Sequence, residues 1–409
     1  MNTLLRANLF LLFLVAVFDP ADRVTHLKVP LFISLWVIFV LGWLISKQSM
    51  APVPGSMLIY ILMFAVVLPL TSILFYFLRG GPADPYDGFQ YLKSYLFLNL
   101  AVILVLRKID AVRSLSIVLT MLSVAILAME VFTYNDQGLT QFLWVIGDSS
   151  GIFAIGTRTY ADLSYSYAYF HAAPLLVLSL AYFSYRTVTA ERNARYSNVG
   201  LLLLNLAAML CSGTRNDIIF GLLTPLLVFI WYSSKTHRFA IFALLLVGVA
   251  ILATYGTDVV QAMFDPGNES NAIKLAHVKD YSVLFSNPKI LFFGQGLGSY
   301  FYSSGFGTET SITELTYLEF IRSFGLILAT VYYGLLLYPI AKLRDEKLRN
   351  SHYLVVAYSA YLIICVANPL LVSSTGMLLL SIVAARAFSP GETNWNLVTS
   401  ETRVQQTPA

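Results

Sequence analysis

Charge is what this sequence has least of. Asp, Glu, Lys and Arg together make up 12% of the 409 residues, about half the share found in an ordinary soluble domain. Apolar side chains make up 57%, and the mean hydropathy is +0.71. A soluble fold of this size could not bury so much apolar surface behind so few charges. The composition therefore excludes a soluble enzyme, a disordered protein and a nucleic-acid binder, and it indicates a polytopic membrane protein.

Cysteine is nearly absent as well. Cys211 and Cys365 each lie in an apolar run, which argues against a disulfide framework and against a cysteine metal site. The sequence also lacks the H-E-x-x-H pair of zinc proteases, a C-x-x-C pair and a phosphate-binding P-loop. We therefore expect neither a metal ion nor an organic cofactor.

Apolar runs of the length that crosses a bilayer, about 20 residues, recur along the chain. We interpret twelve of them as transmembrane helices, which predicts an all-α, polytopic membrane domain over residues 1–389. Asp19-Pro-Ala-Asp22 follows the first run in place of a cleavage site, so we expect that run to be retained as a helix. The runs cover 5–18, 29–46, 56–78, 91–106, 112–132, 166–184, 198–212, 216–233, 238–254, 313–340, 353–368 and 370–388.

The basic residues favour one orientation of these helices. With a cytoplasmic N-terminus, 16 of the 26 Lys and Arg residues fall on the cytoplasmic side, where membrane proteins concentrate positive charge. Both termini are then cytoplasmic, including a polar tail at 390–409, and two long loops at about 133–165 and 255–312 face the periplasm. Long loops without secondary structure of their own are usually functional, so we expect the chemistry at the periplasmic face.

Three arginines are expected at that face. Arg158 precedes the sixth run, Arg215 lies in the turn between the seventh and eighth, and Arg322 lies inside the tenth. Arginine suits phosphate because its guanidinium group donates two parallel hydrogen bonds. For Arg158 and Arg215 the alternative is that the side chains only reach toward the membrane interface. For Arg322 the alternative is an i,i+3 pair with Glu319.

The longer loop contains a segment, 271–285, with the pattern of a surface helix. Lys274, His277 and Tyr281 share one face of that helix, and neighbouring apolar residues would anchor it along the membrane. The imidazole of His277 titrates near neutral pH, so it could act as a general base, with Asp280 to orient it. A lone histidine in a loop is as often an ordinary surface residue, and that alternative stays open.

A glycine-rich stretch, Gly294-Gln-Gly-Leu-Gly298, follows this segment. It lacks the strand–helix context of a dinucleotide site, so we interpret it as non-helical backbone that lines a water-filled cavity. Glu314 opens the tenth run, where a carboxylate either interacts with the helix N-terminus or takes part in chemistry. The periplasmic loops contain no D-x-D pair for a metal-bound sugar nucleotide. A sugar transferred at this face must therefore come from a lipid-linked donor.

Several of these features together resemble the O-antigen and exopolysaccharide polymerases of bacteria (Wzy type) and the related O-antigen ligases. The features are about twelve helices, a large late periplasmic loop, the turn at 212–215, the stretch at 294–298 and the run from Glu314 to Leu326. The resemblance implies a GT-C-type glycosyltransferase of the bacterial inner membrane. Such an enzyme moves the growing glycan from undecaprenyl diphosphate onto a new lipid-linked repeat unit. Membrane lipids and a chain-length regulator protein are further candidate partners, and nucleic acid is not one.

The resemblance also implies roles for individual residues. Periplasmic arginines of this family bind the donor diphosphate, which implies that role for Arg158, Arg215 and Arg322. Ligases use a histidine of the large loop near the acceptor, and His277 is its counterpart here. The residues themselves fit this chemistry, because arginines can stabilise a leaving diphosphate and either His277 or Glu314 could deprotonate an acceptor hydroxyl. We favour His277, because its ordinary pKa of about 6.5 makes it a stronger base than Glu314 at about 4.3.

Three further residues, Lys274, Tyr281 and Tyr160, are expected to contact the diphosphate or the glycan. For Tyr160 the alternative is an aromatic belt at the membrane interface. Two other functions stay open. A ligase-type transferase would use the same residues, whereas a flippase for lipid-linked glycans should have paired broken helices and polar residues at the middle of the bilayer.

Overall fold

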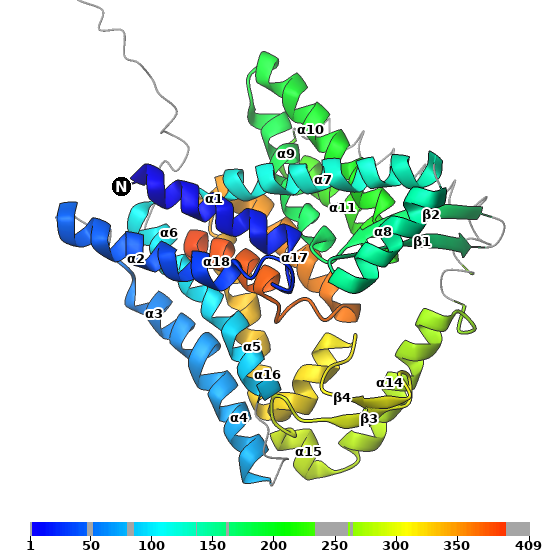
Figure 1. The fold of residues 1–409 in the computed structure, drawn as a ribbon. Coiled ribbons are helices and arrows are strands. Elements are labelled where there is room, and N and C mark those ends of the chain that lie inside the picture. The colour runs from blue at the N-terminus through cyan, green and yellow to red at the C-terminus, as the bar shows by residue number, and fades with distance from the viewer. Residues whose placement is uncertain are drawn as a thin grey trace, which may run out of the picture.

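The computed structural model describes residues 2–46, 52–79, 86–135, 137–160, 163–233, 261 and 265–389. Helices make up most of this part of the chain, and two short β-hairpins accompany them (Figure 1). The all-α prediction is therefore confirmed in outline, and the hairpins are an addition to it. The predicted ninth helix at 238–254 and the predicted tail at 390–409 lie outside the described residues.

The elements before the first hairpin are helices. α3, η1 and α4 follow one another without a break, and the π-helical η1 lies between two α-helical parts. The bounds are α1 Asn2–Phe18, α2 Lys28–Ser46, α3 Gly55–Leu62, η1 Met63–Val67, α4 Leu68–Leu78, α5 Tyr86–Leu96, η2 Phe97–Asn99, α6 Leu100–Arg107, α7 Ala111–Asn135 and α8 Gln137–Ser150.

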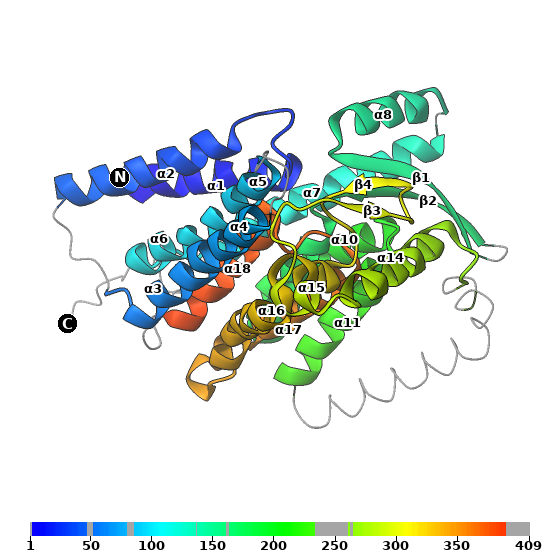
Figure 2. The same cartoon turned by 90° about the horizontal axis from the view of Figure 1, so that it is seen from below.

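The remaining elements include both hairpins. The first hairpin, β1 and β2, precedes three helices, and the second, β3 and β4, precedes the long helix α16 (Figure 2). The bounds are β1 Phe153–Tyr160, β2 Leu163–Phe170, η3 Ala173–Leu175, α9 Leu176–Thr189, α10 Arg192–Cys211, α11 Arg215–Tyr232, α14 Glu269–Phe285, α15 Pro288–Phe293, β3 Phe301–Ser303, β4 Thr308–Thr310, α16 Thr316–Leu343, η4 Glu346–Ser351, α17 His352–Ile364, η5 Cys365–Ala367 and α18 Ser374–Phe388.

Among the described residues, seven helical stretches are long and apolar enough to cross a membrane. These stretches indicate a membrane-embedded helical protein. They are Lys28–Ile45, Gly55–Leu78, Gly88–Arg107, Ala111–Tyr134, Arg192–Cys211, Arg215–Tyr232 and Thr316–Leu343. Three shorter apolar helices cover Thr3–Phe18, His352–Ala367 and Ser374–Phe388. The count of twelve spans and the periplasmic orientation stay predictions.

The predicted sixth helix, 166–184, is wrong in its first part. Residues Leu163–Phe170 form β2, which pairs antiparallel with β1 so that Phe153 lies opposite Phe170. In this run tyrosines alternate with small residues, which is the period of a strand and not of a helix, and aromatic residues favour strands. With α8 and the hairpin, the predicted loop at 133–165 also has secondary structure of its own.

Polar contacts tie the helices of the core together. On α10 the buried Asn205 accepts hydrogen bonds from Ser123 of α7 at 3.0 Å and from Ser179 of α9 at 2.7 Å. Hydrogen bonds between small polar side chains commonly join neighbouring helices inside a membrane, where water is absent. Helices α17 and α18 bury most of their side chains, as expected for helices surrounded by other helices.

The long helix α16 is interrupted at Gly325, which has φ 73° and ψ 159°. The glycine-rich stretch fills the break, and the backbone N–H of Gln295 donates to the carbonyl of Arg322 at 2.5 Å. A Cβ on Gly325 would lie 2.4 Å from the carbonyl oxygen of Phe292, so only glycine fits. The stretch is therefore largely buried against α16, where it satisfies freed carbonyls, and Leu297 also lines a small pocket beside Thr313 and Glu319. That the stretch lines a water-filled cavity stays a prediction.

Candidate functional site

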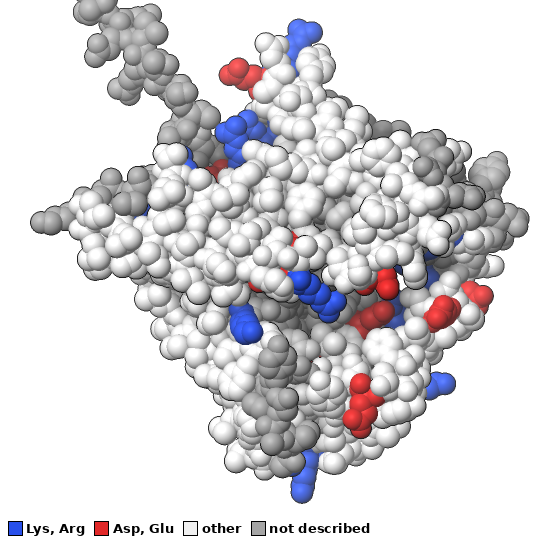
Figure 3. All heavy atoms as spheres, viewed as in Figure 1, with Lys and Arg blue, Asp and Glu red and all other residues white. Residues whose placement is uncertain are grey.

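Both hairpins, α14 and the first turns of α11 and α16 meet at one end of the helical bundle (Figures 1 and 2). Hydrogen bonds join α11 to α14, and an ion pair joins α14 to the segment before α16. Figure 3 shows that charged side chains are sparse over much of the surface and gather along a hollow between the two halves of the view. This end of the bundle is the one that the positive-inside pattern assigns to the periplasm.

The central element of the site is α14. Its N-cap, Asn268, accepts a hydrogen bond from the backbone of Ser270 at 3.2 Å, and Glu269 lies in the first turn, where a carboxylate is favourable. The predicted helix over 271–285 is therefore confirmed. His277 and Tyr281 are its buried side chains, and their partners lie on β3 and α16.

His277 is completely buried. Its Nε2 lies 2.8 Å from Oγ of Ser303 on β3, and its ring packs edge-on against Phe306 with the centroids 4.6 Å apart. Its Nδ1 has no hydrogen-bond partner among the described residues. Burial lowers the pKa of His277 below the usual imidazole value, and the carboxylates of Glu314 and Asp280 oppose that shift. The ring is therefore neutral near pH 7, and one of its nitrogens carries a lone pair that can accept a proton.

The turn between β3 and β4 covers the imidazole. A Cβ on Gly305 would lie 2.9 Å from Nε2 of His277, so the turn packs directly on the ring. Asp280, which was expected to orient His277, accepts two hydrogen bonds from Ser304, from the backbone at 2.8 Å and from the hydroxyl at 2.7 Å. Asp280 therefore holds the covering turn.

Glu314 lies two residues before α16. Its Oε2 is 3.3 Å from Nζ of Lys274, and the two side chains are 37% and 31% exposed. Lys274 also donates to the hydroxyl of Ser270 at 3.3 Å. Because both charged groups reach solvent, each can exchange this contact for a ligand.

Arg215 is the first residue of α11 and is half-buried. Its Nη1 donates to Oδ1 of Asn271 at 2.6 Å, and its Nη2 donates to Oδ1 of Asn268 at 3.1 Å. The guanidinium fork thus spans two amide oxygens at the start of α14. Two phosphate oxygens can take the place of such neutral acceptors, because the same fork matches them and adds a charge–charge attraction.

The turn before Arg215 is fixed by capping. Thr214 is the N-cap of α11, and its hydroxyl accepts from the backbone N–H of Asp217 at 3.2 Å. The hydroxyl of Ser212 donates to Oδ2 of Asp217 at 3.1 Å. The buried Asp217 leaves its Oδ1 without a partner among the described residues. Capping of this kind sets the direction in which Arg215 leaves the helix.

Arg158 lies on β1 of the first hairpin. Its guanidinium carbon is 5.0 Å from the ring centroid of Tyr167 on β2, which is a cation–π contact. Tyr167 in turn packs on Gly213, where a Cβ would lie 2.3 Å from Cβ of the tyrosine. The hairpin therefore lies on the turn that carries Arg215, and it brings Arg158 to the same end of the site.

Electrostatic interactions link the first hairpin to the opposite side of the site. Burial raises the pKa of Tyr169 on β2, and Asp217 and Glu314 raise it further, whereas Arg158 lowers it. The same Glu314 acts on the pKa of His277. Glu314 is thus a common neighbour of the hairpin and of the imidazole.

Arg322 is paired with Glu319, which is the alternative to phosphate binding that its spacing in the sequence predicts. It is completely buried; its Nη2 lies 2.5 Å from Oε1 of Glu319, and its Nε lies 3.1 Å from Oε2. Its other hydrogen bonds go to the side chain of Gln295, to Ser299 and to the carbonyl of Ser311. The i,i+3 pair with Glu319 is therefore confirmed, and the structure places this guanidinium group inside the protein.

Tyr281 belongs to the same buried network. Its hydroxyl donates to Oε2 of Glu319 at 2.7 Å and lies 2.6 Å from Oγ1 of Thr313. The structure thus gives Arg322 and Tyr281 protein partners at the positions where substrate contacts were expected. Together they join α14 to α16 beneath the site.

The structure therefore brings five predicted site residues to one end of the bundle: Arg158, Arg215, Lys274, His277 and Glu314. Tyr160 ends β1 opposite Leu163, and its side chain lies outside the described part of the chain.

Residues that the sequence did not single out hold these groups in place. Asn268 and Asn271 receive Arg215, and Ser303 bonds His277. An asparagine just before an acidic first turn is an N-cap signal that could have identified Asn268. Ser303 gives no such signal, because its role depends on a hairpin 26 residues beyond the histidine.

The sequence contains one match to a catalytic serine motif, but the structure does not place that serine at the turn which the motif requires. Residues 147–151, Gly-Asp-Ser-Ser-Gly, fit the G-x-S-x-G nucleophile elbow. The elbow requires the serine at a strand-to-helix turn, whereas Ser149 lies in the last turn of α8 and donates to the carbonyl of Ile146 at 3.1 Å. Among the described residues, no three His, Cys, Asp or Glu side chains form a group that could hold a metal ion.

Comparison with known proteins adds no family. No protein-family model matches this chain, and no curated protein matches it.

Proposed function

We propose that this protein is a membrane glycosyltransferase that polymerises a bacterial polysaccharide. It transfers the growing glycan from undecaprenyl diphosphate onto a new lipid-linked repeat unit, at the periplasmic face of the inner membrane. Apolar helices with polar groups gathered at one end suit this reaction, because the carrier lipids stay in the bilayer while the sugars and the diphosphate lie at its surface.

The arrangement around α14 is the observation that carries the proposal. Along one helix lie the arginine fork received by Asn268 and Asn271, the Lys274–Glu314 ion pair and the neutral imidazole of His277. Transfer from a lipid diphosphate needs a base for the acceptor hydroxyl and positive charge for the leaving group. Both requirements are met at this end of the bundle.

In the proposed reaction the acceptor hydroxyl gives its proton to His277 while its oxygen bonds to the anomeric carbon of the donor. The bond from that carbon to the diphosphate breaks, and the lipid diphosphate leaves with the bonding electrons. Arg215 and Arg158 stabilise its charge. When Nε2 of His277 donates to Ser303, the lone pair lies on Nδ1. Nδ1 is buried, so the acceptor hydroxyl reaches it only after the side chains packed around the ring move.

The test uses purified full-length protein in lipid nanodiscs, with lipid-linked oligosaccharide isolated from the cells that make it. The expected result is a ladder of longer glycans on undecaprenyl diphosphate that grows with time without a nucleotide sugar. Arg215→Ala should abolish the ladder, and Arg195→Ala, an exposed arginine outside the site, should leave it unchanged. Absence of any ladder from folded wild-type protein would contradict the proposal.

A flippase is the alternative that one observation favours. The break in α16 at Gly325 is of the kind found in transporters, whose discontinuous helices bind substrate at the middle of the membrane. Here the break is filled by the stretch that includes Gln295, and the nearby Arg322 is paired with Glu319. The polar groups at the break are thus already engaged, which supports a transferase over a transporter. A ligase would use the same residues and would differ in placing the glycan on another lipid anchor.

A further inference from the structure

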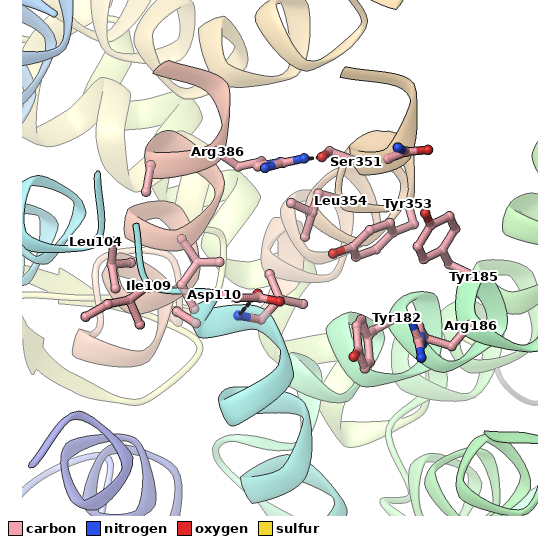
Figure 4. A pocket seen from close by; sticks show the side chains of 15 residues that line it. Leu104, Ile109, Asp110, Tyr182, Tyr185, Arg186, Ser351, Tyr353, Leu354 and Arg386 are labelled. Atoms are coloured by element: carbon pink, nitrogen blue, oxygen red, sulfur yellow. Dashed lines mark hydrogen bonds between the residues drawn. The ribbon is translucent and has the colours of Figure 1, made fainter. Parts of the chain in front are cut away.

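A polar pocket, drawn in Figure 4, is lined by helix ends that lie at the end of the bundle opposite the site around His277. Helix α7 begins at this pocket and ends beside α8 and the first hairpin, and α9 runs from that hairpin back to the pocket. The lining comes from the end of α6, the start of α7, the end of α9, the start of α17 and the end of α18. The pocket is therefore separate from the site around His277.

Two arginines line this pocket. Arg386, in the last turn of α18, donates from Nε to the hydroxyl of Ser351 at 2.5 Å. Arg186, in the last turn of α9, is half-buried beside Tyr182 and Tyr185 (Figure 4). Among the described residues, Arg186 has no hydrogen bond and no ion pair. A half-buried guanidinium group that makes no hydrogen bond or ion pair with the described residues is a place where an anion can bind.

The charge of the pocket is positive overall. Asp110 is the acidic residue of its lining, and its carboxylate accepts from the backbone of Val112 at 3.2 Å. Arg386 and Arg113 interact with that carboxylate, and Arg186 adds a further positive charge. The N-termini of α7 and α17 also open onto the pocket, and the positive ends of helices favour anions.

The pocket lies where two candidate membrane spans end. One span ends at Arg107 and the next begins at Ala111, so the side chains between them lie at the level of the lipid headgroups. Tyr182, Tyr185 and Tyr353 form an aromatic wall of the kind found at membrane interfaces. Basic pockets between helices on the cytoplasmic side are known binding places for anionic lipid headgroups.

We propose that this pocket binds a phosphate-bearing anion, either the headgroup phosphate of an acidic membrane lipid or free phosphate. Arg186 holds the phosphate oxygens, and the positive charge of Arg386 and of the two helix N-termini adds to the attraction. The proposal does not depend on the proposed glycosyltransferase activity, since it concerns the other end of the helices.

The test measures thermal unfolding of purified protein in detergent during titration with three probes: phosphatidylglycerol, inorganic phosphate and a diacylglycerol without phosphate. Wild-type protein should be stabilised by phosphatidylglycerol or by phosphate, and not by diacylglycerol. Arg186→Gln should bind the effective probe about 10- to 150-fold more weakly, as expected for the loss of a charge-assisted hydrogen bond. Arg192→Gln is the matched control, because Arg192 is exposed at the start of α10, at the same end of the bundle.

Each outcome has a definite meaning. Stabilisation by phosphatidylglycerol alone identifies a lipid headgroup as the ligand, and stabilisation by inorganic phosphate identifies the free anion. Equal weakening in Arg186→Gln and Arg192→Gln would overturn the proposal, because it would show general attraction to a basic surface. Equal stabilisation by diacylglycerol, or no stabilisation by any probe, would overturn it as well. Unchanged unfolding of probe-free Arg186→Gln protein excludes a loss of folding as the cause.

Discussion

Arg215 and Arg322 lie at the same end of the bundle, yet their surroundings are opposite. Arg322 is completely buried and paired with a carboxylate, and each of its nitrogens donates to a protein acceptor. Arg215 is half-buried, and its fork rests on the amide oxygens of Asn268 and Asn271. The sequence assigned both arginines to phosphate, and the structure separates them by the charge and accessibility of their partners.

The difference shows how this protein uses arginine. A guanidinium group that is buried with a carboxylate cannot lose that partner without leaving an unpaired charge in a poorly solvated place. A guanidinium group that is held by neutral amides can exchange them for an anion at little cost. The buried Arg322–Glu319 pair stabilises the packing beneath the site. The amide-held Arg215 is suited to bind a ligand.

The largest effect is expected from removal of the buried arginine. Arg322→Met should destabilise the folded protein by about 3–5 kcal/mol, because Glu319 is left as an uncompensated buried charge. Thermal unfolding in detergent would measure this loss, and the double variant Arg322→Met/Glu319→Gln should recover part of it. Full stability with complete loss of activity would show instead that Arg322 serves the substrate.

Arg215 should behave in the opposite way. Arg215→Lys keeps the charge but loses the fork, so chain extension should fall about 10- to 150-fold while the unfolding temperature stays close to that of the wild type. Extension rates and unfolding temperatures of the same preparations provide the comparison. Normal polymer length and rate in both Arg215→Ala and Arg158→Ala would rule out the diphosphate role.

A pH profile sharpens the assignment of the base. Burial lowers the pKa of His277, so the imidazole stays able to accept a proton down to a pH below about 6.5, and the acid limb of activity should lie below that value. In Asp280→Asn one carboxylate that raises this pKa is lost, so the limb should move to still lower pH. A limb that moves upward would contradict the sign of this interaction.

The same shift affects stability. The unfolded chain binds a proton at His277 near pH 6.5, and the folded chain binds it only at lower pH. The contribution of neutral His277 to stability is therefore present above that pH and is lost as the pH falls through the window below it.

The smallest effect is expected at the exposed ion pair. Lys274 and Glu314 are each about one third exposed, at 31% and 37%, and such pairs contribute about 0–1 kcal/mol. Lys274→Gln should therefore leave the unfolding temperature nearly unchanged. A large loss of stability in this variant would place the pair in the structural group with Arg322.

Local patterns predicted much of the fold. The apolar runs identified most of the helices, and the spacing of Lys274, His277 and Tyr281 identified α14. The pair between Glu319 and Arg322 could be foreseen because i,i+3 neighbours face each other on a helix.

What the sequence did not predict depends on contacts between distant residues. Residues 166–170 of β2 fall within the predicted helix 166–184, because hydropathy does not distinguish a strand rich in tyrosine from an apolar helix. The packing of the glycine-rich stretch into the break at Gly325 joins residues that are distant along the chain, so no local pattern indicates it. The burial of His277 beneath a hairpin turn likewise follows from tertiary packing.

Chain extension by purified His277→Ala protein tests the central claim most directly. The variant should fold, insert and bind lipid-linked donor, but extend it about 10²–10⁴-fold more slowly than the wild type, as expected for loss of a general base. His352→Ala, at a histidine whose ring bonds the carbonyl of Asp345 away from the site, should extend normally. Extension at the wild-type rate by His277→Ala, together with no extension by Glu314→Gln, would contradict the account and assign the base to Glu314.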